Sequence, residues 1–153
     1  MMILGVNATK EAIFVAETEG VGEDFVASTV RRIQFRIERA NDLADLLQSV
    51  STILHRGPDS TVLTIAILKC SDGPYGSSVE AIKAETIVEL AAIQKGLSIV
   101  GVAPQSLKKA LGCATGVKWQ ERAKQLFNAT GQHSYWSQGA NGAVSAAFKV
   151  AIS

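Results

Sequence analysis

Few acidic residues stand in the central part of the chain, and they are the candidates there for binding a divalent cation. These acids are Asp72, Glu80, Glu85 and Glu89. Glu85 and Glu89 stand four residues apart and share one face of a predicted helix, a spacing that can recruit a divalent cation through oxygen ligands. A helix face in contact with water, with Lys83 nearby, explains the same spacing. We favour the solvated face over a Mg²⁺ or Mn²⁺ site at Asp72, Glu85 or Glu89.

A turn-rich segment, 71–78, lies between a predicted buried strand and a predicted helix. Free backbone N–H groups at a helix start attract anions, and Ser77 and Ser78 add hydroxyl donors. The same composition forms an ordinary turn with a helix cap, because Ser77 stands three residues before Glu80 as in a capping box. The segment lacks the Gly-Lys-Ser/Thr element of a phosphate-binding loop. We favour the turn, with Ser77 as the cap.

Basic residues gather in the C-terminal part of the chain around one aromatic residue. Residues 61–153 hold nine bases against five acids, and no Asp or Glu follows Glu121. The cluster consists of Lys108, Lys109, Lys118, Arg122 and Lys124. It can contact phosphates while Trp119 stacks on a base. Charges scattered over two elements are also common on protein surfaces, so we favour an ordinary surface over nucleic-acid binding.

The overall composition excludes several classes of protein. The 15 basic and 14 acidic residues give a formal charge of +1, which excludes both strongly basic nucleic-acid binders and acidic disordered chains. Every apolar run is shorter than the roughly 18 residues of a membrane span, and the start of the chain lacks a basic signal-peptide segment. Cys70 and Cys113 have neither paired nor metal-ligand spacing, as in reduced cytosolic thiols. We expect one soluble cytoplasmic domain over residues 1–153.

Hydrophobic periodicity predicts the elements that must position these residues. Strands are predicted at 2–7, 12–16, 25–35, 61–68 and 99–103. Helices are predicted at 43–54, 78–95, 117–129 and 140–152. The first is capped by Asn41 or Asp42 and stopped by Gly57-Pro58. The second has Val79, Ile82, Leu90 and Ile93 as its apolar positions. This order predicts an α/β fold: an antiparallel meander and strand–helix–strand crossovers form a five-stranded mixed sheet with helices on both faces.

The element order resembles the ribonuclease H-like fold, and nearly the whole chain is similar to its RuvC-type Holliday-junction resolvase branch. Ile3-Leu4-Gly5-Val6-Asn7 is similar to the opening hydrophobic-Leu-Gly-Ile-Asp strand of that branch, and Ile65-Ala66-Ile67-Leu68 to its fourth strand. Residues 92–100 resemble the stretch of that branch in which a helix ends at an Arg-Gly pair and the fifth strand begins. Its Lys…Gly-x-Gly…Lys-x-Gln stretch is matched by Lys108-Lys109, Gly112, Gly116, Lys118 and Gln120.

The resemblance implies a nuclease in which carboxylates on the first strand, the fourth strand and the last helix hold two divalent metals. Asn7 replaces the first-strand Asp, and Leu68 or its neighbour Lys69 replaces the fourth-strand Glu. The acid pair of the last helix falls in 141–145, which contains no acid. The resemblance therefore implies a bacterial family with degenerate catalytic acids.

Our leading hypothesis is a catalytically inactive ribonuclease H-like domain that acts as a binding or regulatory protein without a cofactor. Its ligand would contact Asn7, Thr9, Lys69, Ser77, Ser78, Lys118 and Asn141. For Asn7 taken alone, we favour a strand-end turn over contact with a ligand. Two alternatives remain: a metal-dependent nuclease that uses Asp72, Glu85 or Glu89, and a structural subunit that forms a homodimer through the 78–95 helix, as the resolvases do.

Overall fold

The computed structural model describes residues 2–54, 64–71 and 76–153. The strands are β1 (Met2–Ala8), β2 (Ala12–Glu19), β3 (Val26–Gln34), β4 (Thr64–Leu68) and β5 (Ser98–Val102). The helices are α1 (Ala40–Ile53), α2 (Val79–Gln94), α3 (Leu107–Ala110), α4 (Trp119–Phe127) and α5 (Asn141–Ala151). Three short helical turns, η1 (Gly22–Asp24), η2 (Pro104–Ser106) and η3 (Trp136–Ala140), complete the elements. The predicted order is confirmed, with α3 as an unpredicted addition.

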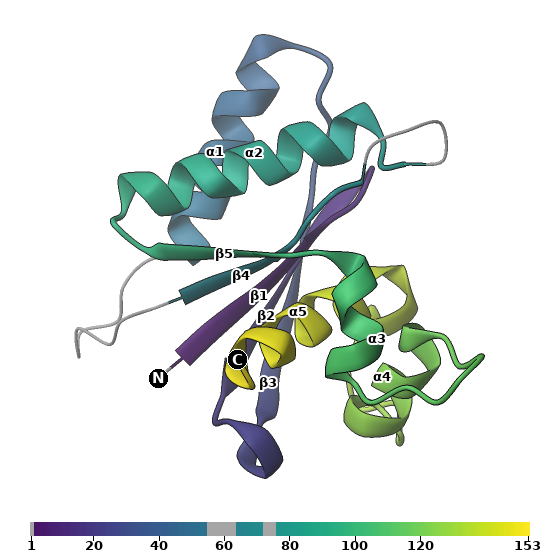
Figure 1. Cartoon of the computed structure of the whole chain (residues 1–153). Helices are drawn as coiled ribbons and strands as arrows, with labels where there is room; N and C mark the ends of the chain where they lie inside the picture. The colour runs from purple at the N-terminus through teal and green to yellow at the C-terminus, as the bar shows by residue number, and fades with distance from the viewer. Residues whose placement is uncertain (1, 55–63, 72–75) are drawn as a thin grey trace.

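The five strands form one mixed sheet in the order β3-β2-β1-β4-β5. The strands β1, β2 and β3 pair antiparallel, whereas β4 pairs parallel with both β1 and β5. This arrangement confirms the predicted meander followed by crossovers. Because β1, β4 and β5 are parallel, their carboxyl ends lie along one edge of the sheet (Figure 1). Open α/β sheets place their binding sites at that edge.

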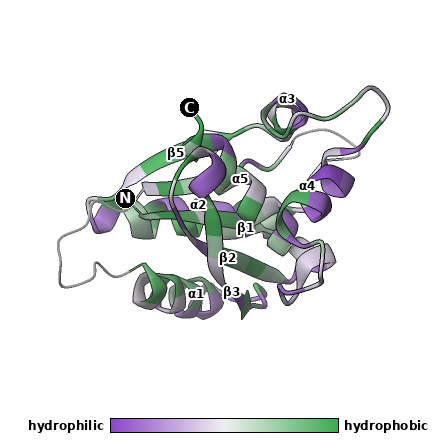
Figure 2. Ribbon diagram, turned by 90° about the horizontal axis from the view of Figure 1, so that it is seen from below, coloured by the Kyte–Doolittle hydropathy of each residue, from purple (hydrophilic) through white to green (hydrophobic). Residues whose placement is uncertain are grey.

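Helices cover both faces of the sheet, as predicted. The helices α1 and α2 lie on one face, and α5 lies on the other with α3 and α4 beside it (Figure 1). Side chains of a strand alternate between the faces, so Leu4 and Val6 of β1 pack toward α1 and α2, while Ile3 packs toward α5. The central strands are therefore apolar on both sides, and Figure 2 shows hydrophobic residues along β1 and β2.

The start of α1 corrects the predicted cap. The helix begins at Ala40, so Asp42 is its third residue and Arg39 precedes it. The Asp42 carboxylate accepts hydrogen bonds from the backbone N–H groups of Glu38 and Arg39 at 2.9 and 3.0 Å. These bonds lower the pKa of Asp42. Of the two predicted caps, Asp42 does bond the start of the helix, but from inside it as the third residue. Gly57-Pro58 lies outside the described residues.

The helix α2 is confirmed, and the apolar residues that predicted it are not the ones that pack against the sheet. Its buried positions are small or charged: Ala81, Ala84, Glu85, Val88, Ala91 and Ala92. The large apolar residues that marked the predicted helix, Val79, Ile82, Leu90 and Ile93, are exposed. A helix with apolar residues on both faces gives no periodic signal for which face is buried.

Within the described part of the chain, no helix is both long and apolar enough to cross a membrane.

Candidate functional site

Three segments far apart in sequence meet at the carboxyl ends of β1 and β4. Asn7 of β1 lies opposite Leu68 of β4 in the parallel register. The first turn of α5 packs directly against both: a Cβ atom added to Gly142 would lie 2.5 Å from Asn7 Nδ2 and 2.8 Å from Leu68 Cδ2. We call Asn7, Leu68, Asn141 and Gly142 the strand-end site. It joins the first strand, the fourth strand and the last helix.

The side chains of the strand-end site are engaged with the protein itself. Asn7 Nδ2 donates a hydrogen bond to the carbonyl oxygen of Gly139 at 3.0 Å. Asn141 Oδ1 accepts one from the backbone N–H of Gly142 at 2.7 Å. Leu68 is 8% exposed and contributes only apolar surface. Mg²⁺ and Mn²⁺ require hard oxygen ligands, normally carboxylates, so this donor set does not fit the metals that the resemblance implies.

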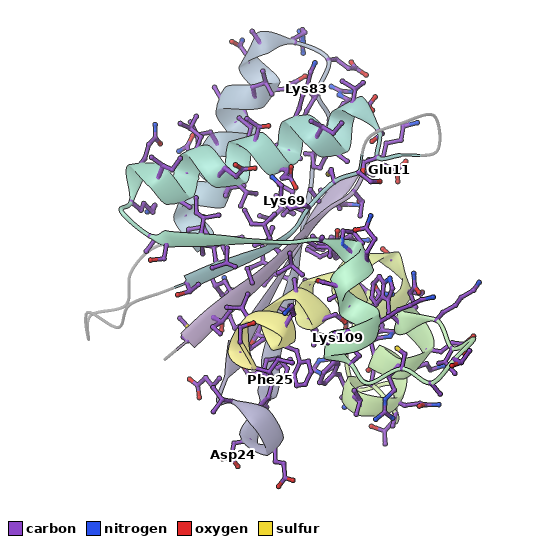
Figure 3. The ribbon with its side chains drawn as sticks, viewed as in Figure 1. Glu11, Asp24, Phe25, Lys69, Lys83 and Lys109 are labelled. Carbon is purple, nitrogen blue, oxygen red and sulfur yellow. The ribbon has the colours of Figure 1, made fainter. Side chains whose placement is uncertain are left out.

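The neighbouring residue, Lys69, points to the opposite face of the sheet. Successive residues of a strand alternate, so only Leu68 can take the fourth-strand position beside Asn7. Lys69 lies between α2 and the sheet, as Figure 3 shows. Its Nζ lies 3.2 Å from Glu85 Oε2 and 3.0 Å from Glu89 Oε1. The structure thus decides between Leu68 and Lys69, which the sequence left open.

The cluster of Lys69, Glu85 and Glu89 corrects the prediction of a solvated helix face. Glu85 is only 5% exposed, and its Oε1 accepts a hydrogen bond from the backbone N–H of Cys70 at 2.9 Å. The partner of the two carboxylates is Lys69, not Lys83. Burial lowers the pKa of Lys69, but its hydrogen bonds to Glu89 and Glu85 and their charges outweigh burial, so the pKa is raised.

The Lys69 ammonium also bears on the alternative metal site. It bridges the two carboxylates that the metal would need, and it supplies their positive charge from the chain itself. The third predicted ligand, Asp72, lies outside the described residues. Among the residues that are described, no three or more His, Cys, Asp or Glu side chains gather closely enough to hold a metal ion.

The predicted cap of α2 is wrong by one residue. Ser78 caps the helix, because its Oγ accepts a hydrogen bond from the backbone N–H of Ala81 at 3.1 Å. Ser77 instead pairs with Ser71: its Oγ accepts from the Ser71 N–H at 3.1 Å, and its own N–H donates to the Ser71 carbonyl at 2.9 Å. Both serines therefore have structural partners.

The predicted ligand set is divided between two places. Asn7 and Asn141 belong to the strand-end site on the α5 face, whereas Lys69 pairs with α2 on the other face. Thr9 closes the β1–β2 turn, with its Oγ1 donating to the Ala12 carbonyl at 2.9 Å. Lys118 is exposed immediately before α4. A one-residue step along β4 thus separates residues that the sequence placed together.

A polar group next to the strand-end site escaped the sequence analysis. The Arg32 guanidinium carbon lies 4.3 Å from the centroid of the Tyr135 ring, and Arg32 Nη1 donates to Gln138 Oε1 at 3.2 Å. Tyr135 has a φ of 60°, a left-handed conformation that is uncommon outside glycine. It begins the turn whose Gly139 carbonyl accepts from Asn7. Arg32 lies opposite Phe14 in the β2–β3 register, so its side chain is on the sheet face that η3 covers, and the sequence pattern gave no sign of this contact.

The topology defines the class as an α/β protein with a mixed five-stranded sheet covered by helices on both faces. Solved structures place it more narrowly. Thermus thermophilus RuvC has a TM-score of 0.71 and 16% identity, covering 98% of this chain and 95% of its own. The same protein in complex with a Holliday junction substrate has a TM-score of 0.69 and 15% identity, covering 98% of this chain and 94% of its own. The yeast mitochondrial Holliday junction resolvase has a TM-score of 0.55 and 12% identity, covering 96% of this chain and 78% of its own. The chain has the RuvC-type fold, as predicted.

The similarity is one of structure rather than of sequence. No family model matches the chain, and no curated protein matches it. Elements of the same kind and order can be built from very different residues when the apolar pattern is preserved. The function must therefore be argued from the residues of this chain.

Proposed function

We propose that this chain is a RuvC-type domain, extending over residues 1–153, that binds nucleic acid without cutting it. The strand-end site carries the proposal. At the three places where the resemblance implies carboxylates, this chain has an amide at Asn7, an apolar side chain at Leu68 and no acid at the start of α5. Without carboxylates, the site has no means of holding two metals that would activate water and stabilise the leaving oxygen. The complex of RuvC with a Holliday junction supports nucleic acid as the ligand class.

The charge distribution supports the same ligand. The ion pairs of the described residues lie elsewhere: Arg31–Glu17, Arg36–Glu38 and Lys69 with Glu85 and Glu89. Lys108, Lys109 and Lys118 of the described part of the chain therefore have no carboxylate within 4.0 Å. The absence of acids after Glu121 also removes repulsion of phosphates near α5. Unpaired surface lysines bind phosphates by releasing counterions.

The proposal is tested by binding and cleavage on the same labelled substrates. A four-way junction, a duplex and a single strand are titrated with the protein at several salt concentrations, and each is incubated with Mg²⁺ and with Mn²⁺. We expect binding that weakens with salt and no cleavage. A Lys118→Ala variant should weaken binding and reduce the slope of log affinity against log salt by about one.

The control carries the same loss of charge at a distant position. Lys95 follows α2, at the edge of the sheet opposite the strand-end site, so Lys95→Ala should leave affinity and salt slope unchanged. Failure to bind any of the three substrates at low salt would overturn the binding role. Metal-dependent cleavage that Glu85→Gln abolishes would overturn the inactivity and favour the relocated metal site.

We further propose that two copies of the chain pair through the outer face of α2. Val79, Ile82, Leu90 and Ile93, which we call the outer α2 stripe, follow helical spacing along its whole length. Val79 and Ile93, at its two ends, are 64% and 66% exposed. An exposed apolar stripe, interrupted at its centre by Thr86, on a helix that is also apolar on its inner face marks an association surface. A second copy offers the same stripe, as two-fold pairing requires.

Sedimentation velocity over a range of concentrations tests the pairing. We expect a dimer for the unmodified chain and a monomer for Ile93→Lys, because the new charge would be buried between the two helices. Gln48→Lys places the same charge on the exposed face of α1 and should remain dimeric. A monomer at every concentration of the unmodified chain would contradict the proposal.

A further inference from the structure

A hollow lies where the parallel strands β4 and β5 end. Ser71, Pro104, Gln105, Lys108 and Trp119 line it, and its volume is about 460 Å³. Its walls come from the segment after β4, from the turn and helix after β5, and from the first residue of α4. We call it the Trp119 pocket. It lies along the sheet edge that also carries the strand-end site.

The aromatic wall of the pocket is held in place by the core. Trp119 is half-buried and packs against the hydrophobic cluster that contains Leu68, Leu107 and Leu111. The Arg122 Nε donates to the Leu111 carbonyl at 3.1 Å and so ties the first turn of α4 to the end of α3. The backbone that carries Trp119 is therefore held beside the pocket, which lowers the entropic cost of ordering the indole against a ligand.

The other walls supply a cation and neutral polar groups. Lys108 brings a positive charge into the lining, and Lys109 and Lys118 are exposed nearby in sequence. Gln105 offers an amide that can donate and accept hydrogen bonds, and Ser71 offers a hydroxyl. An aromatic face beside an ammonium and an amide suits a flat heteroaromatic ring that carries a phosphate. Figure 3 shows Lys109 on α3, on the side of the sheet away from Lys69.

The dimensions restrict the ligand further. A volume of about 460 Å³ lies within the range of pockets for small molecules and suits a single base with its sugar. A base inside a duplex has both faces covered by its neighbours, so only an unpaired base can place a face on Trp119. We propose that the Trp119 pocket receives one unpaired nucleobase of the bound nucleic acid, stacked on the indole with its phosphate at Lys108. This inference rests on the proposed function and deepens it.

Binding to strands that differ in one unpaired segment tests the pocket. The ligands are a blunt duplex, the same duplex with a short single-stranded overhang, and that overhang with abasic sites, each as DNA and as RNA. Trp119→Ala should weaken binding to the overhang about tenfold, because the variant removes the stacking of one base on the indole. It should leave the blunt duplex and the abasic overhang unchanged. Trp119→Phe keeps an aromatic face and should retain most of the affinity.

Fluorescence provides an independent measurement. The chain has two tryptophans, and Trp136 is 9% exposed in the core, so Trp136→Phe leaves Trp119 as the only indole. We expect the overhang, but not the abasic one, to quench that fluorescence. Equal losses on all ligands in Trp119→Ala, or no loss on any, would overturn the pocket while the binding role stands. Absence of binding to every ligand by the unmodified chain would overturn both, and the circular dichroism spectrum of each variant verifies its fold.

Discussion

A Gly5→Ala variant should lose about 3 kcal/mol of its free energy of unfolding. A Cβ atom at Gly5 of β1 would overlap the carbonyl oxygen of Ala143 in α5 and would lie 2.7 Å from its carbonyl carbon. These are backbone atoms in the middle of the packed core, so the helix itself must move. Because α5 carries Asn141 and Gly142, this movement would also separate them from Asn7. Urea denaturation followed by circular dichroism measures the loss.

A second strand glycine provides the matched control. A Cβ atom at Gly101 of β5 would meet only the side chain of Lys69, 3.1 Å from its Cδ and 3.2 Å from its Cγ. That flexible side chain can shift by a few tenths of an ångström, so Gly101→Ala should change stability by less than about 1 kcal/mol. Equal stabilities of the Gly5→Ala and Gly101→Ala variants would show that α5 does not pack on β1 as closely as described.

A Lys69→Met variant should lose about 2 kcal/mol of stability. It leaves the Glu85 carboxylate buried, with the Cys70 N–H as its remaining donor in the cluster. Removing one partner of a buried pair costs about 3–5 kcal/mol, and the smaller value follows because the Lys69 side chain is 43% exposed. Glu89→Gln should cost much less, since Glu89 is 36% exposed and screened by water. Denaturation of the two variants in parallel compares the costs.

The pH dependence of this loss follows from the raised pKa of Lys69. A cation whose pKa is higher in the folded than in the unfolded chain stabilises the fold fully below the unfolded value. That contribution disappears as the pH rises through the folded value. The stability difference between the unmodified chain and Lys69→Met should therefore be constant at neutral pH and should shrink above the ordinary lysine value of 10.5.

A double variant separates the ion pair from the packing of the lysine stem. If Lys69 acts mainly through charge, Lys69→Met combined with Glu85→Gln should be more stable than Lys69→Met alone, because no unpaired charge remains buried. Additive losses in the double variant would instead assign the effect to the contact between the Lys69 stem and Gly101. A stability difference that persists unchanged above the lysine pKa would lead to the same conclusion.

The pattern of apolar and charged residues along the chain predicted the structure correctly wherever a residue type is compatible with only one local structure. The alternation and the apolar runs predicted the five strands, and the Glu121 boundary of the acids predicted an acid-free last helix. The pattern predicted α2 but not its buried face, because Val79 and Ile93 are as apolar as Val88 and only the sheet decides which side is buried. It also failed by one residue at the cap, where Ser77 and Ser78 are chemically equivalent and Ala81 is reached only by Ser78.

The sequence by itself determined the strands and helices of this fold, and it showed that no acid stands at the three places where the resemblance implies carboxylates. Both features depend only on which residues are present and in what order, so they can be read from the sequence without the tertiary structure. Only the tertiary structure decided that Leu68, and not Lys69, stands beside Asn7, and that Lys69 forms ion pairs with both Glu85 and Glu89. The physical reason is the two-residue period of a strand: a step of one residue along β4 moves a side chain to the other face of the sheet.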